Sequence, residues 1–309
     1  MLERRARAWT PQGVLGEIMS ADGCLPVSRL VRDVDAGLSD GGRLARPPLR
    51  ASASCVDDVM ADLAVEVVVT RLDVGPDIVR ASAALLSDAE RQRASRFRFD
   101  RERRRFVVAR ARLRQLLGAR LDVRPDAVEL VYGKRGKPAL AGRFADSGLR
   151  FNLSHCDDVA LYAFSYGREI GVDIEAVRMV PDADVIAAHM FSRGENEVYR
   201  TLDPRDKPLG FFNCWTRKEA FIKALGDGLY YPLDRFDVSL APSEPARILR
   251  VENTTGDQCG WTLHRCWPGP GLIGAIVVQQ VACESASPVG SERIIGDSLA
   301  PWLSSGHDT

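Results

Sequence analysis

The sequence predicts an α+β protein built from two similar α/β halves that are related by a pseudo-twofold axis. The strand-like segment LAVEVVVTRLDV is matched by a second one, IGVDIEAV at 170–177. Each segment is followed by a capping box, the Ser-x-x-Glu signature of a helix start: Ser87 with Glu90, and Ser192 with Glu195. This agreement in order and spacing indicates two copies of one α/β plan.

The first half continues with a basic run over 91–120, and we expect its helix to end at Gly118. Arginine dominates this run, and its phenylalanines and leucines form an apolar stripe that would dock on a core. A solvated helical face is the ordinary interpretation of such a run. A docked arginine-rich helix would also suit phosphate groups. The segments LRFNLSH and VALYAFS then predict two strands.

The second half repeats this order. We expect the helix WTRKEAFIKALG to end at Gly226, followed by the strand RFDVSL. A final pair of strands, near 261–265 and 272–281, completes the half. Ligand sites often lie where such halves meet, so the junction is the first place to seek function.

Four segments are predicted in all: a flexible extension over 1–60, a first half over 61–167, a second half with a metal site over 168–284, and a flexible tail over 285–309. The extension is rich in Gly, Arg, Asp and Ser and lacks sustained periodicity. A translation start at Met60 would equally explain why patterned sequence begins after that residue.

Composition excludes several classes of protein. Lys and Arg together number 42, as do Asp and Glu, so the net charge favours neither nucleic acid nor a membrane. The seven cysteines form no CxxC pair, which argues against a disulfide framework or a zinc knuckle and favours a reducing cytoplasm. The N-terminal segment lacks the apolar core of a signal peptide, and the longest apolar run is too short to span a bilayer.

Three carboxylates stand out. Alternation along a strand places Asp173 and Glu175 on one face, where two like charges need a compensating positive charge. Glu219 shares a helix face with Trp215 and Lys223. Carboxylates without clustered histidine or cysteine suit Mg²⁺. The alternatives are a strand pair neutralised by arginines and an ordinary surface Glu–Lys pair.

Two further segments carry polar groups. In FNLSH, Asn152 and Ser154 share one strand face, with His155 at the strand end. Adjacent strand residues face apart, so Ser154 and His155 do not form a catalytic dyad, and hydrogen bonding to an oxyanion suits them better. The segment GKRGKPAL at 133–140 predicts a tight, positively charged turn.

These motifs, in this order, resemble those of the 4′-phosphopantetheinyl transferases, specifically the Sfp-like branch. They are GKP at 136–138, FNLSH at 151–155, GVDIE at 171–175 and WTRKEAFIK at 215–223. The resemblance covers about residues 62–283. It implies two α/β halves with coenzyme A between them, and transfer of the phosphopantetheine arm to a serine of an apo acyl or peptidyl carrier protein. Adenosine 3′,5′-bisphosphate would be released.

The resemblance also implies roles for individual residues. Asp173, Glu175 and Glu219 would hold Mg²⁺, and whether Glu175 does so directly or through water is open. Lys223 would balance charge on the leaving phosphate. Glu219, directly or through a metal-bound water, is the candidate acceptor of the serine proton. Asp173, Glu219 and Lys223 are therefore the candidate catalytic residues.

Coenzyme A would be bound by a second set of residues, which Lys223 would join. Lys137, Ser154 and His155 are implied at its nucleotide end or its phosphates. Arg93 and Arg105 fall where family members place basic residues near the 3′-phosphate.

The carrier protein would dock near VIAAHMFSRGENEVY at 185–199, which we expect to expose the apolar residues Val185, Ile186, Met190 and Phe191 beside Arg193. An amphipathic helix that simply packs on the core is the alternative. We expect a monomer, and the identity of the client carrier is open.

Three other functions remain as alternatives. The first is an inactive coenzyme A- or nucleotide-binding homologue, which would lack a carboxylate or Lys223. The second is a Mg²⁺-dependent kinase or nucleotidyl transferase, which would need a phosphate loop. The third is an RNA-binding protein built on the arginine helix, although aromatic stacking residues are missing.

Overall fold

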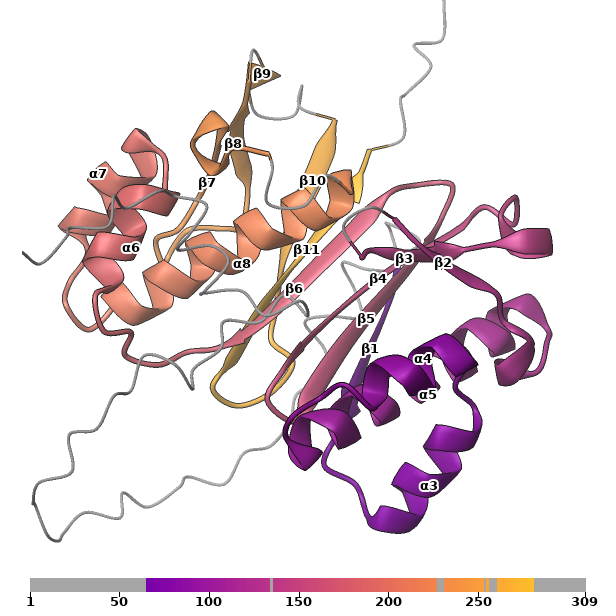
Figure 1. Cartoon of the computed structure of the whole chain (residues 1–309). Coiled ribbons are helices and arrows are strands. Elements are labelled where there is room, and N and C mark those ends of the chain that lie inside the picture. The colour runs from indigo at the N-terminus through magenta and orange to yellow at the C-terminus, as the bar shows by residue number, and fades with distance from the viewer. Residues whose placement is uncertain (1–64, 134–135, 227–230, 253, 256–259, 281–309) are drawn as a thin grey trace, which may run out of the picture.

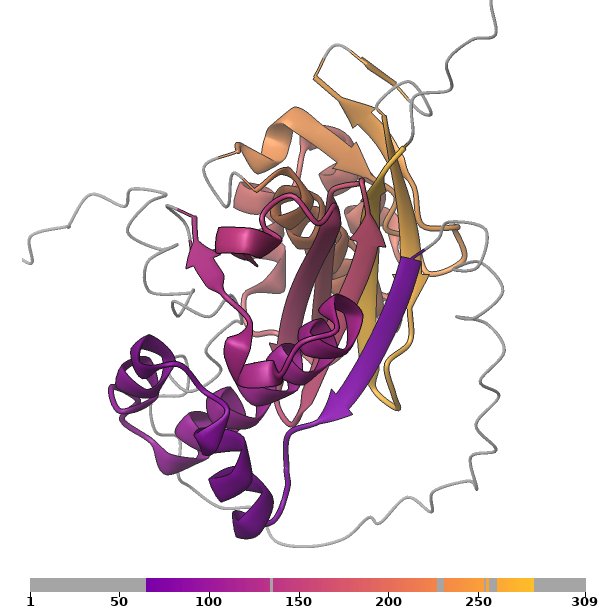
Figure 2. The ribbon, with the colours of Figure 1, turned by 90° about the vertical axis from the view of Figure 1, so that its right-hand side faces the viewer.

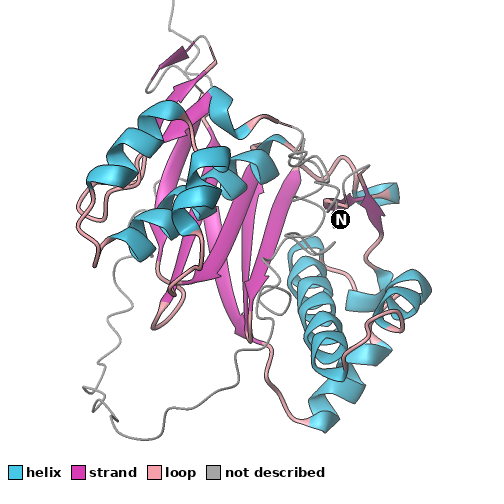
Figure 3. Cartoon of the chain, turned by 60° about the vertical axis from the view of Figure 1, so that its left-hand side comes forward, coloured by secondary structure: helices cyan, strands magenta, loops and turns pink. Residues whose placement is uncertain are grey.

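The computed structural model describes residues 65–133, 136–226, 231–252, 254–255 and 260–280. The predicted extension over 1–60 and tail over 285–309 lie outside these residues. Helices gather in two groups, one from each half, with the strands between them (Figure 1 and Figure 3). No helix in the described ranges is long and apolar enough to cross a membrane.

The first half contains a three-stranded antiparallel sheet and a long helix. The sheet has the order β1-β5-β4. The elements of this half are β1 (Val65–Arg71), α3 (Pro76–Ala84), α4 (Asp88–Ala94), α5 (Asp100–Leu121), the 3-10 helix η2 (Pro125–Ala127), β2 (Leu130–Tyr132), β3 (Pro138–Leu140), the 3-10 helix η3 (Gly142–Phe144), β4 (Leu149–Cys156) and β5 (Val159–Tyr166).

The second half has a corresponding sheet with the order β10-β11-β6, which is also antiparallel. Its elements are β6 (Ile170–Ala176), α6 (Ala183–Met190), α7 (Arg193–Thr201), α8 (Lys207–Leu225), the 3-10 helix η5 (Leu233–Arg235), β7 (Phe236–Val238), β8 (Ile248–Val251), β9 (Thr254–Thr255), β10 (Trp261–Cys266) and β11 (Leu272–Gln279).

The two sheets are connected in the same way. In each, the first strand of the half pairs with the last strand, and the last strand pairs with the one before it. The α+β class is confirmed, and the two halves repeat one strand connectivity; the pseudo-twofold axis stays a prediction. The proposed division after residue 167 falls at the turn between β5 and β6, where Gly167 has a φ of 67°.

Both capping boxes form as predicted. The Ser87 hydroxyl accepts from the Glu90 backbone N–H, and the Glu90 carboxylate accepts from the Ser87 N–H at 2.9 Å. Ser192 and Glu195 make the same reciprocal bonds. Each box satisfies two backbone donors that a helix start would otherwise leave unpaired.

The basic run is two helices rather than one. It divides between α4 and α5, with residues 95–99 between them. The expected end at Gly118 is wrong, because α5 continues to Leu121 and is capped by Asp122 in the left-handed conformation (φ 52°). Gly118 serves packing instead, since a Cβ there would lie 2.7 Å from the Val123 carbonyl oxygen. Gly226 caps α8 as expected, with a φ of 80°.

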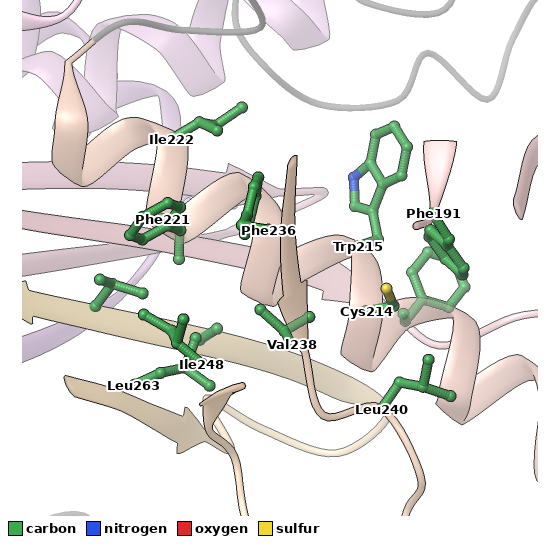
Figure 4. Packing of buried hydrophobic residues seen from close by; sticks show 14 of the residues in the cluster. Phe191, Cys214, Trp215, Phe221, Ile222, Phe236, Val238, Leu240, Ile248 and Leu263 are labelled. Atoms are coloured by element: carbon green, nitrogen blue, oxygen red, sulfur yellow. The ribbon is translucent and has the colours of Figure 1, made fainter. Parts of the chain in front are cut away.

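Four apolar clusters lie among the described residues, and three of them hold these layers together. One lies between α5 and the β1-β5-β4 sheet. A second surrounds α8 and includes Trp215, Phe221 and Phe236 (Figure 4). A third joins the two sheets, as the strands of both halves run side by side in Figure 2. On β6 the buried Val172 and Ile174 belong to this third cluster, so alternation directs Asp173 and Glu175 to the opposite face.

Candidate active site at the junction of the halves

The candidate site lies where β4 of the first half runs beside β6 of the second. These strands belong to different sheets, so side chains rather than a backbone ladder connect them. The buried Asn152 accepts a hydrogen bond at its Oδ1 from the backbone N–H of Val172, at 2.9 Å. Asn152 therefore anchors the strand that carries the acidic residues, a role that the sequence did not reveal.

Ser154, Asp173 and Lys223 form a hydrogen-bonded group across this junction. The Ser154 hydroxyl donates to Asp173 Oδ1 at 2.9 Å, and Lys223 Nζ lies 2.6 Å from the same oxygen. Lys223 also donates to Ser154 Oγ at 3.2 Å. The group unites three sequence motifs from β4, β6 and α8. Burial raises the pKa of Asp173, and the nearby Lys223 ammonium opposes this rise.

Glu219 lies on the same face of α8 as Lys223 and is only 3% exposed. Burial, with the Asp173 charge adding to it and Lys223 opposing it, raises the pKa of Glu219 to about 8. Its Oε1 has no hydrogen-bond partner among the described residues, and the same is true of Asp173 Oδ2. Two buried carboxylates thus each keep an oxygen available for a ligand.

Glu175 is also buried but is less closely joined to this group. Arg178 Nη1 lies 3.6 Å from its Oε2, and the Cys156 thiol lies 3.8 Å from the same oxygen. Burial, followed by the Asp173 charge, raises the pKa of Glu175 to about 9. The arginine partner is the alternative that the sequence left open, and the structure realises it for Glu175.

The donor set fits a hard divalent cation in chemistry. Oxygen ligands are what Mg²⁺ prefers, and the unpartnered oxygens of Asp173 and Glu219 are what such an ion would engage. Across the described ranges, however, no three His, Cys, Asp or Glu side chains converge closely enough to form a metal site. The present arrangement is compensated by Lys223 and Arg178 instead.

The close approach of α8 to β6 depends on Gly171. A Cβ at this position would lie 2.1 Å from the Ala220 carbonyl oxygen and 2.3 Å from the Ala224 backbone nitrogen. Only glycine lets the helix backbone lie directly on the strand. This contact sets Glu219 and Lys223 beside Asp173.

Comparison with known proteins gives matches over the segments that form this site. Residues 169–268 match the 4′-phosphopantetheinyl transferase superfamily, and residues 76–166 match the family described as 4′-phosphopantetheinyl transferase, N-terminal. The chain is 41% identical over 196 residues to the 4′-phosphopantetheinyl transferase HetI of Nostoc sp., which covers 63% of this chain and 79% of HetI. The chain belongs to the 4′-phosphopantetheinyl transferase superfamily.

Other transferases of the superfamily are also similar. The 4′-phosphopantetheinyl transferase AcpT of Escherichia coli strain K12 is 33% identical over 180 residues, covering 58% of this chain and 83% of AcpT. The human L-aminoadipate-semialdehyde dehydrogenase-phosphopantetheinyl transferase is 29% identical over 161 residues, covering about half of each chain (50% and 52%). The predicted family is therefore confirmed at the level of the superfamily.

The residues implied to bind coenzyme A differ in burial and in their contacts within the protein. Lys137 reaches from the β2–β3 hairpin to the end of α8, where its Nζ lies 3.3 Å from the Ala224 carbonyl oxygen and 3.4 Å from Glu169. Burial lowers the pKa of Lys137, and the Glu169 carboxylate opposes this decrease. His155 is half-buried on the face of β4 opposite to Ser154.

The two implied arginines differ from each other. Arg93 of α4 lies over the Phe106 ring, with its Cζ 5.4 Å from the ring centre. Arg105 of α5 is buried among acids, donating from Nε to Asp158 at 2.8 Å and from Nη1 to Glu102 at 2.9 Å. The carboxylates of Asp158 and Glu102 thus engage Arg105, whereas its buried Nη2 has no hydrogen-bond partner among the described residues.

The expected apolar docking surface is smaller than the sequence predicted. Val185 is 51% exposed, whereas Ile186 and Met190 are partly buried against the core around α8. The prediction was wrong for Phe191, which is 4% exposed and lies in the apolar cluster around α8 (Figure 4). Its ring contacts those of Tyr199 and Phe211. The face of α6 that carries Ile186 and Met190 packs on the core, as one face of an amphipathic helix commonly does.

Proposed function

We propose that this transferase is active, requires Mg²⁺, and moves the 4′-phosphopantetheine arm of coenzyme A to a serine hydroxyl of an apo acyl or peptidyl carrier protein. The serine oxygen attacks the phosphorus that bears the pantetheine. The bond from that phosphorus to the bridging diphosphate oxygen breaks, and adenosine 3′,5′-bisphosphate leaves. The serine proton must pass to a base, because an alcohol is a weak nucleophile.

The chain's own residues supply positioning and charge. Lys223, held 2.6 Å from Asp173, would stabilise negative charge on the departing phosphate. Glu219 would accept the serine proton, directly or through water, and its raised pKa suits a proton acceptor near neutral pH. Ser154 donates to Asp173 and so fixes which of its oxygens remains available.

Asp173, Glu175 and Glu219 would hold the Mg²⁺, and the unpartnered oxygens of Asp173 and Glu219 support that assignment. When bound, the ion would withdraw charge from the diphosphate. Glu175 would need to exchange its contact with Arg178 for the ion or for a water bound to it. Lys137, His155, Arg93 and Arg105, together with Ser154 and Lys223, are the proposed coenzyme A ligands.

The observation that carries this proposal is the buried group of Ser154, Asp173, Glu219 and Lys223, formed by both halves of a chain that belongs to the transferase superfamily. An inactive coenzyme A-binding homologue would be expected to have lost one of these groups. All four are present: Ser154, Asp173 and Lys223 are hydrogen-bonded to one another, and the charges of Asp173 and Lys223 act on the pKa of Glu219.

The test is incubation with coenzyme A, Mg²⁺ and a panel of apo carriers from fatty-acid, polyketide and nonribosomal-peptide synthesis. Mass spectrometry should show a gain of one phosphopantetheine on at least one carrier. Asp173→Ala and Glu219→Ala should abolish it, whereas Asp126→Ala, a partly exposed carboxylate paired with Arg124, should not. Absence of any gain across the panel with the unaltered enzyme would overturn the proposal.

We place the carrier-docking surface at α6 and the start of α7. Val185 is exposed there, and the Arg193 side chain is 95% exposed and forms an ion pair with Glu197 at 3.1 Å. Charge reversal by Arg193→Glu should raise the KM for the carrier and leave coenzyme A binding unchanged, as followed by kinetics and calorimetry. Equal weakening of both would contradict this placement.

We further propose that the enzyme acts as a cytoplasmic monomer. The buried thiols of Cys214 and Cys266 form no disulfide within the part of the chain that the structure describes, as a reducing compartment would keep them. Size-exclusion chromatography with light scattering should give the mass of one chain at concentrations used for the assay. A stable dimer would contradict the monomer.

A further inference from the structure

The second half contains a buried arginine that the proposed reaction does not use. Arg217 of α8 is 1% exposed. Its Nη1 donates to the carbonyl oxygen and the hydroxyl of Ser239, on the segment between β7 and β8. Its Nη2 is buried and has no hydrogen-bond partner among the described residues. Burying a guanidinium donor without an acceptor costs free energy, so a ligand for Nη2 is indicated.

Arg265 of β10 adds a second cation at the same place. Burial, followed by the positive charge of Arg265, lowers the pKa of Arg217 to about 10, so the two guanidiniums lie near each other. Arg265 donates from Nη2 to the carbonyl oxygens of Pro242 and Glu244, and its Nε is buried without a partner in the described ranges. The Glu244 carboxylate opposes the shift at Arg217, but Glu244 is exposed. Two adjacent cations thus each keep a buried donor that needs an acceptor.

Asn213 places a buried acceptor on the same side of α8. It lies one turn before Arg217, and its Nδ2 donates to the Leu240 carbonyl oxygen at 2.9 Å, next along the chain from the one that Arg217 binds. This bond fixes the orientation of the amide, so Oδ1 is the atom left without a partner among the described residues. The cluster therefore combines two charged donors with one neutral acceptor.

The first half has apolar side chains at the corresponding helix positions. Arg114 and Lys218 each bind the capping-box glutamate of their own half, and this contact aligns α5 with α8. In this alignment Leu113 corresponds to Arg217, and Ala109 corresponds to Asn213. Both first-half residues are buried in the apolar cluster between α5 and its sheet. Packing of the long helix on the sheet therefore does not itself require an arginine and an asparagine.

The strands show the same difference. Pairing from the fourth residue of β1 leads across β5 to Leu153 of β4. Pairing from the fourth residue of β6 leads across β11 to Arg265 of β10. Leu153 packs against the apolar cluster of the first half, whereas Arg265 meets Arg217. All three positions of the polar cluster are thus apolar in the first half, which points to a polar ligand in the second.

The cluster reaches the surface at Arg265. This residue is only partly buried, and its Cζ lies 5.6 Å from the centre of the Trp267 ring, which is 49% exposed. Arg217 and Asn213 are each 1% exposed. A small ion that enters beside Arg265 can reach them, whereas a side chain of another protein cannot.

We propose that Arg217, Arg265 and Asn213 bind one inorganic phosphate ion. Near neutral pH, phosphate has ionised oxygens, which would accept from Arg217 Nη2 and Arg265 Nε, and a hydroxyl, which would donate to Asn213 Oδ1. Sulfate has no hydroxyl at this pH, so the asparagine acceptor would select phosphate. The ion would fasten the segment between β7 and β8 to α8. The site uses none of the residues of the proposed reaction.

Thermal denaturation of the intact protein at pH 7 tests the proposal in phosphate, sulfate and chloride at equal ionic strength. Both oxyanions stabilise proteins in general, so the difference between them is the informative quantity. Saturating phosphate should give a Tm about 2–4 °C above that in sulfate. Arg217→Leu, which introduces the residue type of the first half, should remove this difference, and so should Arg265→Leu. Asn213→Ala should reduce it, because the acceptor of the phosphate hydroxyl is lost.

Arg247→Leu is the matched control, because Arg247 is an exposed arginine on the segment between β7 and β8, and it should keep the full difference. If Arg217→Leu also kept the difference, the inference would be overturned, and its loss in Lys223→Met would then place the phosphate at the proposed active site. Equal Tm values in phosphate and sulfate for the unaltered protein would overturn it too, since water alone would then meet these groups. Should Arg217→Leu fail to fold, Arg265→Leu and Asn213→Ala decide by the same comparison.

Discussion

The two halves of the molecule share a buried ion-pair clamp. In the first half the capping-box Glu90 pairs with Arg114 of α5 at 2.6 Å, with both side chains at most 3% exposed. In the second half the capping-box Glu195 pairs with Lys218 of α8 at 2.8 Å, with both at most 2% exposed. Each clamp ties the start of one helix to the middle of the long helix that packs on the sheet.

The correspondence extends to the backbone that each cation binds. Arg114 donates to the carbonyl oxygens of Pro125 and Val128. Pro125 is the first residue of η2, and Val128 is the residue that follows the end of η2. Lys218 donates to the carbonyl oxygens of Leu233 and Phe236, which hold the same two places around η5. The repeat is therefore present in individual side-chain contacts as well as in the order of elements.

The halves differ where the long helix meets the first strand. On β6, Gly171 lets α8 approach to backbone contact at Ala220. At the same place on β1 stands Glu66, which pairs with Arg120 of α5. Two strand positions further on, the first half has the apolar Val68, which packs on the core, and the second has Asp173. The two halves thus share a scaffold and differ in the residues at these two strand positions.

The clamps should have the largest effect on stability. Lys218→Met leaves Glu195 buried without its cation and should lower the free energy of unfolding by about 3–5 kcal/mol. Arg114→Met should cost a similar amount if the two clamps are equivalent. Urea denaturation measures both, with the exposed Arg193→Met as a control that should change by about 0.5 kcal/mol or less. A loss under about 1 kcal/mol for Lys218→Met would show that the clamp is not needed.

The contact between β6 and α8 at Gly171 should have the second-largest effect on stability. Gly171→Ala forces the α8 backbone away from β6 and should cost about 1–3 kcal/mol. Because Glu219 and Lys223 move with the helix, the transfer rate should fall as well. Glu66→Ala, the matched change in the first half, removes only a partly exposed ion pair and should cost about 1 kcal/mol or less. Equal effects of the two changes, by denaturation and by transfer assay, would contradict the difference between the halves.

The smallest effect on stability should come from the contact between Arg105 and Asp158, at the turn between β4 and β5. The hydrogen bond from Arg105 holds the pKa of Asp158 below its ordinary value of 3.8, against a smaller effect of burial. The ionised carboxylate therefore favours the folded state above that pH, and this contribution is lost as pH falls through the lowered pKa. Asp158→Asn should cost about 1 kcal/mol or less at pH 7 and less still near pH 2. A gap that widens in acid would contradict this assignment.

Much of the local structure was accessible from the sequence. The Ser-x-x-Glu boxes predicted two helix starts because their bonds are made within one turn. Alternation along IGVDIEAV predicted that Asp173 and Glu175 share a face, since strand geometry has a period of two. Helical spacing likewise predicted that Glu219 and Lys223 lie together.

Other features were not accessible. The break between α4 and α5 and the extension of α5 past Gly118 depend on how these helices pack, since Gly118 is needed for contact with Val123 rather than as a cap. The amphipathic pattern around Phe191 predicted a docking residue, yet the same pattern serves equally to bury that ring against Tyr199.

What the sequence by itself determined is the set of elements and the faces of their side chains, because hydrogen bonds and periodicity within a segment are local. Only the tertiary structure decided which groups meet across segments. It placed Asn152 on the backbone of Val172, Lys223 on Asp173, and Arg110 between the rings of Phe106 and Tyr132. Burial and charge at such contacts depend on residues far apart in the chain, and no spacing rule reports them.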